Sequence, residues 1–269
     1  MTAVVAQEPE IVESADGVPI ACWRSGTGPP LVLVHGSGED HTRWRPVLAR
    51  LSARFTVYAV DRRGRAASGD ADPYDLRDEA RDIAAVIDRA GPGTCLIAHS
   101  YGAICALEAA TLTSGIGRMV LYEPPIPVGG SKEPSGLGAR LGALIEAGEE
   151  LRALGLFLVE VAGVSPREVD VLLRIPGFRE RAPLARTLAR EIEGARRYVI
   201  EPDRFRHLTV PALLLAGGDS PWELRQAVDA VDGMLADSRV AVLPGQTHRA
   251  MDTGPRLFLD TVLGFLQRQ

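Results

Sequence analysis

The sequence predicts one α/β domain built on a doubly wound, mostly parallel sheet, with a helical insertion. Short apolar runs alternate with amphipathic segments along most of the chain, which is typical of strands joined by helices. The apolar runs have the unbroken pattern of strands that are buried on both faces. One stretch, residues 126–206, breaks the alternation and has no clear strand. The length of 269 residues suits a single large α/β domain or two small ones.

The expected elements follow the chain in order. Asp16-Gly17, between the first two apolar runs, indicates a hairpin turn. Residues 31–34 and 240–243 have the pattern of fully buried strands. The segment 76–90 carries its apolar residues on one stripe, as an amphipathic helix does. The expected strands are residues 11–12, 18–23, 31–34, 55–60, 94–98, 119–122, 212–216 and 240–243, and the expected helices are residues 44–51, 76–90, 102–113, 184–198 and 257–266.

The insertion is expected to form a helical cap. Residues 1–125 and 207–269 would then make the core domain, and residues 126–206 the cap. Ser165-Pro166-Arg167-Glu168 has the pattern of a capping box with proline in the first turn, which indicates a helix start. A helical insertion between two strands has to pack on the strand ends, over the place where a site would lie. Apolar residues are available to line that pocket or to fill the cap: Leu137, Leu141, Leu144, Leu156, Phe157, Leu158 and Phe178.

The composition argues against several classes of function. The formal net charge is −5, whereas nucleic-acid binding needs a basic face. No run approaches the roughly 18 apolar residues of a membrane span, and the first residues lack the basic start and apolar centre of a signal peptide. We therefore expect a cytoplasmic protein without a membrane or nucleic-acid partner. The phosphate-binding and metal-binding motifs GxxxxGK[ST], GxGxxG after a strand and HExxH are absent, so no cofactor and no metal is expected.

The strongest chemical signal is Ala98-His99-Ser100-Tyr101-Gly102, which lies directly between an expected strand and an expected helix. A serine in such a sharp turn holds its hydroxyl above the sheet, at the N-terminus of the helix. The small Ala98 and Gly102 suit the limited space of that turn. The backbone N–H of Tyr101 would then point to where an oxyanion forms. Ser100 is the candidate nucleophile, and a simple helix N-cap is the structural alternative.

Together with this motif, the sequence resembles the α/β-hydrolase family over nearly the whole chain. His35-Gly36 resembles the family's HG loop, and the resemblance implies that Ser37 or its neighbour Gly36 provides a second oxyanion N–H. Residues 61–68 resemble the D-x-R-G-x-G-x-S turn, with Ala66 in place of a glycine. Gly245-Gln246-Thr247-His248 resembles the region that delivers the catalytic base.

His248 is the candidate general base. It follows the last expected strand and precedes the final helix. It alone among the histidines lies late enough for the chain order of serine, acid and histidine. A neutral imidazole within hydrogen-bond reach can take the serine proton and return it to the leaving group. A surface loop histidine is the alternative.

Two carboxylates are candidates to orient His248. Many family members carry an aspartate after the penultimate strand, where this chain has Ser220, with Asp219 one residue early. Residues 220–223 also match a capping box, which is a structural explanation for this region. Glu123 ends the buried strand 119–122 and needs a partner there. Its Tyr-Glu-Pro-Pro run is similar to that of haloalkane dehalogenases and the zearalenone-lactone hydrolase, which carry their acid after this strand. We favour Glu123, with Asp219 as the alternative acid.

These residues predict a serine hydrolase that cleaves a small or medium apolar carboxylic ester or lactone through an acyl-enzyme. The expectation of a lactone substrate rests only on the resemblance at Glu123. Serine at position 100, rather than aspartate, argues against dehalogenase or epoxide hydrolase chemistry. The same scaffold supports hydrolysis of C–C bonds and thioesters, because a fold does not fix the reaction. A small-molecule receptor with a vestigial triad is the alternative outside enzymes, and the sequence leaves a homodimer open.

Overall fold

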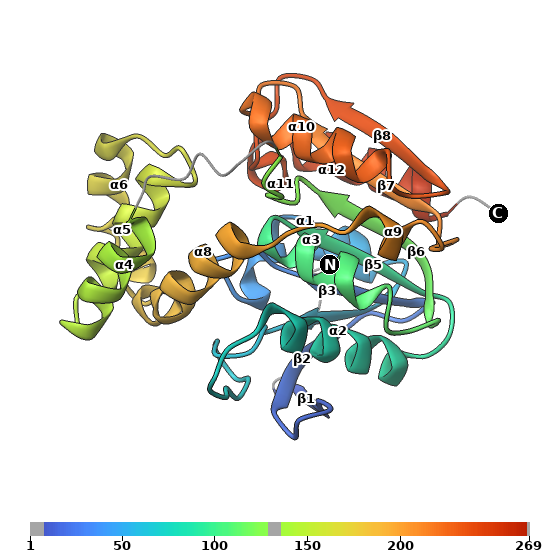
Figure 1. Cartoon of the computed structure of the whole chain (residues 1–269), viewed down its shortest axis with the longest axis horizontal. Coiled ribbons are helices and arrows are strands. Elements are labelled where there is room, and N and C mark those ends of the chain that lie inside the picture. The colour runs from blue at the N-terminus through green and yellow to red at the C-terminus, as the bar shows by residue number, and fades with distance from the viewer. Residues whose placement is uncertain (1–7, 129–135, 268–269) are drawn as a thin grey trace.

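The structure, a computed structural model, describes residues 8–128 and 136–267. Its strands form an eight-stranded sheet in the order β1-β2-β4-β3-β5-β6-β7-β8 (Figure 1). β2 runs antiparallel to β1 and β4, and all other neighbours are parallel. The predicted doubly wound, mostly parallel sheet is therefore confirmed. The strands are β1 (Glu10–Glu13), β2 (Pro19–Ser25), β3 (Pro30–Val34), β4 (Thr56–Val60), β5 (Thr94–His99), β6 (Ile116–Tyr122), β7 (Ala212–Gly217) and β8 (Ser238–Leu243).

Helices cover both faces of the sheet. On one face α2, α3 and α10 share a buried apolar cluster with the strands, and on the other face α1, α11 and α12 do so. Within the two described segments, no helix combines the length and the apolar character needed to cross a membrane. The helical segments are η1 (His41–Trp44), α1 (Arg45–Ser52), α2 (Leu76–Ala90), α3 (Tyr101–Ala109), α4 (Leu137–Glu146), α5 (Glu150–Glu160), α6 (Pro166–Leu172), α7 (Pro176–Arg179), η2 (Ala182–Thr187), α8 (Leu188–Arg197), α9 (Pro202–Phe205), α10 (Trp222–Asp232), α11 (Ala250–Thr253) and α12 (Pro255–Leu266).

The parallel strands bring polar residues together at one edge of the sheet. Every residue of β4 and of β5 is buried, as the unbroken apolar runs predict. Directly after β3, β4, β5 and β6 come His35, Asp61, Ser100 and Glu123 in that order. Because these strands are parallel, their carboxyl ends lie at the same edge, where ligands bind in this architecture.

β8 differs from the prediction of a strand buried on both faces. Val240 and Val242 are 39% and 54% exposed. β8 is the last strand of the sheet, so part of its surface meets solvent although its residues are apolar. Two further boundaries differ by three residues or more: β6 begins at Ile116, before the predicted residue 119, and α3 ends at Ala109, before the predicted residue 113.

The helical insertion lies between β6 and β7. Figure 1 shows α4, α5 and α6 as a group beyond the edge of the sheet, with α8 leading back to it. The apolar residues expected to line a pocket or fill the cap all belong to one cluster of α4, α5, η2 and α8 or pack against it. The predicted capping box of Ser165 and Glu168 is present. The single helix expected at residues 184–198 is instead the 3₁₀ segment η2 followed directly by α8. The boundaries of the cap at residues 126 and 206 stay a prediction.

Candidate active site

Ser100 occupies a sharp turn between β5 and α3. Its backbone has φ 55° and ψ −129°, a conformation that costs free energy for any residue with a Cβ. The turn leaves no room at Gly102, where a Cβ would lie 2.3 Å from the His35 carbonyl oxygen. The N–H of Ser100 still donates to the Tyr122 oxygen of β6 at 2.9 Å, so the hydrogen bonding between β5 and β6 extends to Ser100. Ser100 is partly exposed at the end of a buried strand.

The loop after β3 approaches this serine closely. A Cβ on Gly36 would lie 3.0 Å from Cβ of Ser100, so only glycine fits there without displacement. The N–H of Gly36 donates to Oε2 of Glu39 at 3.1 Å and is therefore engaged. In the part of the chain that the structure describes, the N–H groups of Ser37 and Tyr101 have no acceptor. Of the two loop residues named from the sequence, Gly36 has its N–H bonded to Glu39, whereas the N–H of Ser37 is not so engaged.

Glu39 holds this loop, although no sequence motif indicates such a role. Besides Gly36, its carboxylate contacts Nε of Arg43 at 3.0 Å. Burial would raise the pKa of Glu39, but the Arg43 charge and the nearby His99 hold it well below its ordinary value. The ionised carboxylate therefore anchors the Gly36 amide. The sequence offered no signal for this role beyond the position of Glu39 just after the loop.

His248 and Glu123 lie in direct contact. Nδ1 of His248 is 2.6 Å from Oε2 of Glu123, and the other carboxylate oxygen accepts from the N–H of Gly217 at 2.6 Å. Glu123 is fully buried and has φ 46°, a second strained residue at the same edge of the sheet. Burial would raise the pKa of Glu123, but the hydrogen bond and charge of His248 and the Gly217 N–H lower it below its ordinary value. An ionised Glu123 holds the Nδ1–H tautomer of His248, which leaves Nε2 free to accept a proton.

The structure does not bring Asp219 to His248. The Asp219 side chain is exposed, and its backbone N–H donates to the Gln246 oxygen at 2.9 Å. The capping box suggested for residues 220–223 is absent, because α10 starts at Trp222 with Pro221 in the N-cap position and no side-chain cap. Of the two carboxylates left open by the sequence, Glu123 is the one that contacts the imidazole.

His99 and Tyr122 fix the His248 loop beside the serine turn. The rings of His99 and His248 have centroids 4.5 Å apart, and Nε2 of His99 donates to the His248 carbonyl oxygen at 3.0 Å. The Tyr122 hydroxyl donates to the carbonyl oxygen of Thr247. His99 directly precedes Ser100 and Tyr122 directly precedes Glu123, so the neighbours of Ser100 and Glu123 hold the His248 loop in place.

Apolar side chains of the helical insertion lie against the Gly36–Gly38 loop. A Cβ on Gly38 would lie 3.4 Å from Leu154, 3.6 Å from Phe157 and 3.6 Å from Leu188. Arg181 adds a polar contact, since its Nη2 donates to the Gly38 oxygen at 3.1 Å. The insertion thus covers the loop that carries Ser37. No cluster of three or more His, Cys, Asp or Glu residues suited to a metal ion occurs in residues 8–128 and 136–267.

Known proteins share both the sequence pattern and the fold. The model of the alpha/beta hydrolase family matches residues 31–261. A 2-(acetamidomethylene)succinate hydrolase of Mesorhizobium japonicum is 28% identical over 253 residues, which are 90% of this chain and 89% of that protein. The crystal structure of an alpha/beta hydrolase from Sphaerobacter thermophilus is 33% identical, with a TM-score of 0.84 over 96% of this chain and all of that one. The esterase RhEst1 from a Rhodococcus species shares the fold, at 23% identity and a TM-score of 0.75 over 99% of this chain and 98% of that one. The chain belongs to the alpha/beta hydrolase family.

Proposed function

We propose that this hydrolase cleaves a small or medium apolar carboxylic ester or lactone, with Ser100 as nucleophile, His248 as base and Glu123 as the acid that orients it. The observation that carries the proposal is the contact of 2.6 Å between Glu123 and His248, on a loop tied to the strained turn of Ser100. A buried carboxylate bonded to Nδ1 is the arrangement that makes an imidazole a proton acceptor for a serine.

In the proposed reaction, the Ser100 hydroxyl attacks the substrate carbonyl while Nε2 of His248 takes its proton. The N–H groups of Tyr101 and Ser37 donate to the oxyanion of the tetrahedral intermediate, and each such donor is worth about 10²- to 10³-fold in kcat. His248 then gives the proton to the leaving alcohol, and an acyl-enzyme remains on Ser100. Water activated by the same imidazole releases the acid and restores the serine.

The apolar side chains of Leu154, Phe157 and Leu188 above the Gly36–Gly38 loop support an apolar acyl or alcohol group in the substrate. The position of the acid after β6 supports a lactone as one form of that substrate, by the resemblance of the Tyr122–Pro125 run. The likeness to the esterase RhEst1 supports the fold and not the choice of substrate.

A second candidate follows from the relative with 28% identity, whose name gives 2-(acetamidomethylene)succinate as its substrate. A polar, carboxylate-bearing substrate of that kind would need cationic side chains within reach of Ser100. Arg181, whose Nη2 donates to the Gly38 oxygen at 3.1 Å, is a cation beside the Gly36–Gly38 loop. The apolar contacts at Gly38 favour the ester or lactone instead. C–C bond and thioester hydrolysis use the same serine chemistry and are separated by substrate alone.

The test is hydrolysis of p-nitrophenyl acetate, butyrate and octanoate, of a series of lactone rings and of 2-(acetamidomethylene)succinate by the parent chain and by Ser100→Ala. The expected result is turnover that rises with acyl length and is abolished by Ser100→Ala. Ser165→Ala, which removes a hydroxyl from the exposed start of α6, is the matched control and should keep the parent rate. Tight binding of the same compounds without turnover would support a receptor, and turnover confined to 2-(acetamidomethylene)succinate would support the second candidate.

A further inference from the structure

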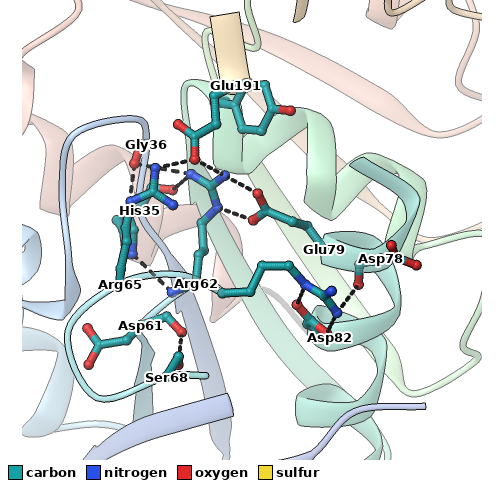
Figure 2. A network of polar contacts seen from close by, with 12 residues as sticks. His35, Gly36, Asp61, Arg62, Arg65, Ser68, Asp78, Glu79, Asp82 and Glu191 are labelled. Atoms are coloured by element: carbon teal, nitrogen blue, oxygen red, sulfur yellow. Dashed lines mark hydrogen bonds and ion pairs between the residues drawn. The ribbon is translucent and has the colours of Figure 1, made fainter. Parts of the chain in front are cut away.

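Arg62 lies at the centre of a buried ion-pair network beneath the Gly36–Gly38 loop. Figure 2 shows its guanidinium between Glu79 and Glu191, with His35 and Gly36 on the other side. Glu79 of α2 accepts from Nε at 2.6 Å and from Nη2 at 2.7 Å, a two-pronged pair with well-defined geometry. The Arg62 side chain is 1% exposed. A cation this deeply buried is costly unless each of its donors has a partner, so its position is strongly fixed.

The remaining nitrogen of Arg62 holds the peptide that carries an oxyanion donor. Nη1 donates to the Gly36 oxygen at 3.2 Å and approaches the His35 oxygen at 3.5 Å, and Nδ1 of His35 also donates to the Gly36 oxygen at 2.8 Å. The Gly36–Ser37 peptide is trans, so its N–H points opposite to its carbonyl. With the carbonyl held by Arg62 and His35, the N–H of Ser37 is directed away from them. A cationic donor on the carbonyl also polarises the peptide and strengthens that N–H as a donor.

Arg62 also touches the residue that carries the other oxyanion donor. Its guanidinium lies 4.8 Å from the centre of the Tyr101 ring, a cation–π distance. The Tyr101 hydroxyl is bonded to the Tyr74 hydroxyl at 2.7 Å, and Tyr74 donates to Oε1 of Glu79 at 2.8 Å. Glu79 therefore holds Arg62 directly and Tyr101 through Tyr74. One side chain, Arg62, contacts both halves of the oxyanion site.

The cap enters the same network through Glu191 of α8. Its Oε1 accepts from Nη2 of Arg62 at 3.0 Å and also from Nη2 of Arg65. Glu191 is fully buried, which would raise its pKa, but the charges of Arg62 and Arg65 lower the pKa to about 2. The carboxylate is thus ionised at neutral pH. A cap helix that moved away would take with it the charge that Arg62 faces.

We propose that Arg62 is a positioning residue that aligns the N–H groups of Ser37 and Tyr101 for the oxyanion, and that Glu191 links this alignment to the seating of the cap. This inference rests on the proposed function, because an oxyanion site has a role only if Ser100 attacks a carbonyl. With 1% of its side chain exposed, Arg62 is not placed to meet substrate or reacting atoms. It acts through the Gly36 carbonyl and the Tyr101 ring.

Arg63 provides a matched control, because it is adjacent on the same loop and equally buried, with 1% of its side chain exposed. Its guanidinium pairs with Asp82 through Nε and Nη2, both at 2.7 Å, and with Asp16 at 3.0 Å. It makes no hydrogen bond to Gly36, His35 or Tyr101 among the described residues. Arg62→Lys and Arg63→Lys each keep one positive charge but lose the planar guanidinium that can form two parallel hydrogen bonds. Of the two, only the guanidinium of Arg62 is bonded to the Gly36–Gly38 loop.

The experiment compares kcat, KM, thermal stability and inhibition by a trifluoromethyl ketone, whose serine adduct places an oxyanion in the site. The parent, Arg62→Lys, Glu191→Gln and Arg63→Lys are measured with p-nitrophenyl butyrate. We expect Arg62→Lys to lower kcat by about 10²-fold, the effect of losing one oxyanion donor. KM should stay near the parent value, and the ketone should bind more weakly by a similar factor. Glu191→Gln should show the same pattern more weakly, and Arg63→Lys should lower Tm but keep kcat and ketone affinity.

Equal losses of kcat in Arg62→Lys and Arg63→Lys, or a loss confined to Tm or KM, would overturn the role of Arg62 while leaving the proposed function intact. Absence of ester turnover in the parent, with no labelling of Ser100, would overturn the proposed function and this inference together. The two failures are therefore distinguishable by the behaviour of the parent. If Arg62→Lys does not fold, Glu191→Gln compared with Arg63→Lys decides the question by the same readouts.

Discussion

Oε2 of Glu123 lies 2.6 Å from Nδ1 of His248, although 125 residues of sequence separate them. Glu123 follows β6, and His248 follows β8. β7 lies between these strands and contributes the Gly217 N–H that bonds the second oxygen of Glu123. The Glu123 carboxylate is therefore held by the sheet through one oxygen and by His248 through the other.

This contact predicts which carboxylate matters for turnover. Glu123→Gln keeps the shape of the side chain but removes the charge that selects the His248 tautomer, so kcat should fall by about 10⁴-fold. Asp219→Asn changes an exposed group without contact to the imidazole and should keep the parent kcat. Steady-state kinetics of both variants check the assignment. A greater loss in Asp219→Asn would move the acid to the turn after β7.

Glu191 should make stability depend on pH in acid. Its pKa is about 2 in the folded chain against an ordinary value of 4.5, because Arg62 and Arg65 offset its burial. A lowered carboxylate pKa stabilises the fold fully above about pH 4.5, and this stabilisation is lost as the pH falls toward 2.

The measurement is urea unfolding of the parent and of Glu191→Gln at several pH values. The free energy of unfolding of Glu191→Gln should be lower than that of the parent at pH 7, and the gap should narrow between pH 4.5 and 3. The difference between the two chains removes the contribution of the other carboxylates. A gap that stays constant over this range would show that Glu191 is not held ionised by the arginines.

Gly102 should tolerate no side chain. A Cβ there would meet the backbone oxygen of His35 at 2.3 Å, and backbone atoms at both ends of the contact cannot move aside easily. Gly102→Ala should therefore destabilise the fold and displace the serine turn from the Gly36–Gly38 loop, with loss of activity. Gly264→Ala is the control, since a Cβ there meets nothing within 4 Å on the exposed side of α12. It should stabilise the fold by about 0.5–1 kcal/mol. Equal effects of the two substitutions in thermal unfolding would contradict the packing argument.

Ala66 occupies a conformation that favours glycine. Its φ is 44°, and the resemblance to the D-x-R-G-x-G-x-S turn places glycine at this position. Relief of the strain on the Cβ by Ala66→Gly should stabilise the chain by about 1 kcal/mol, which is about 2–4 °C in Tm for a protein of this size. Calorimetry checks it, with activity unchanged. A fall in Tm would mean that the flexibility glycine adds to the unfolded chain outweighs the strain.

The sequence was sufficient for those parts of the molecule that depend on local pattern. Unbroken apolar runs gave β3, β5 and β7 close to their observed bounds, and the run around Ser100 gave the turn between β5 and α3. The same local reasoning was wrong at β8. An apolar strand at the edge of a sheet has the same pattern as a central strand, and only the sheet order shows which it is.

Contacts between distant segments could not be predicted. The choice between Glu123 and Asp219 depended on which side chain the sheet register brings to His248. Arg62 and Glu191 are 129 residues apart, and neither stands out in the sequence, because each is one charged residue among many. Each of the two is buried because the other is its partner in an ion pair. Burial of a charged residue depends on the assembled fold rather than on its neighbours along the chain.

Covalent labelling tests most directly whether Ser100 is the nucleophile. The parent chain is incubated with diethyl p-nitrophenyl phosphate, and the modified residue is located by peptide mass spectrometry. We expect one diethylphosphoryl group on Ser100, with loss of esterase activity in step with labelling, and much slower labelling of His248→Ala and Glu123→Gln. Labelling of another residue, or full esterase activity in a chain whose Ser100 is unmodified, would contradict this assignment.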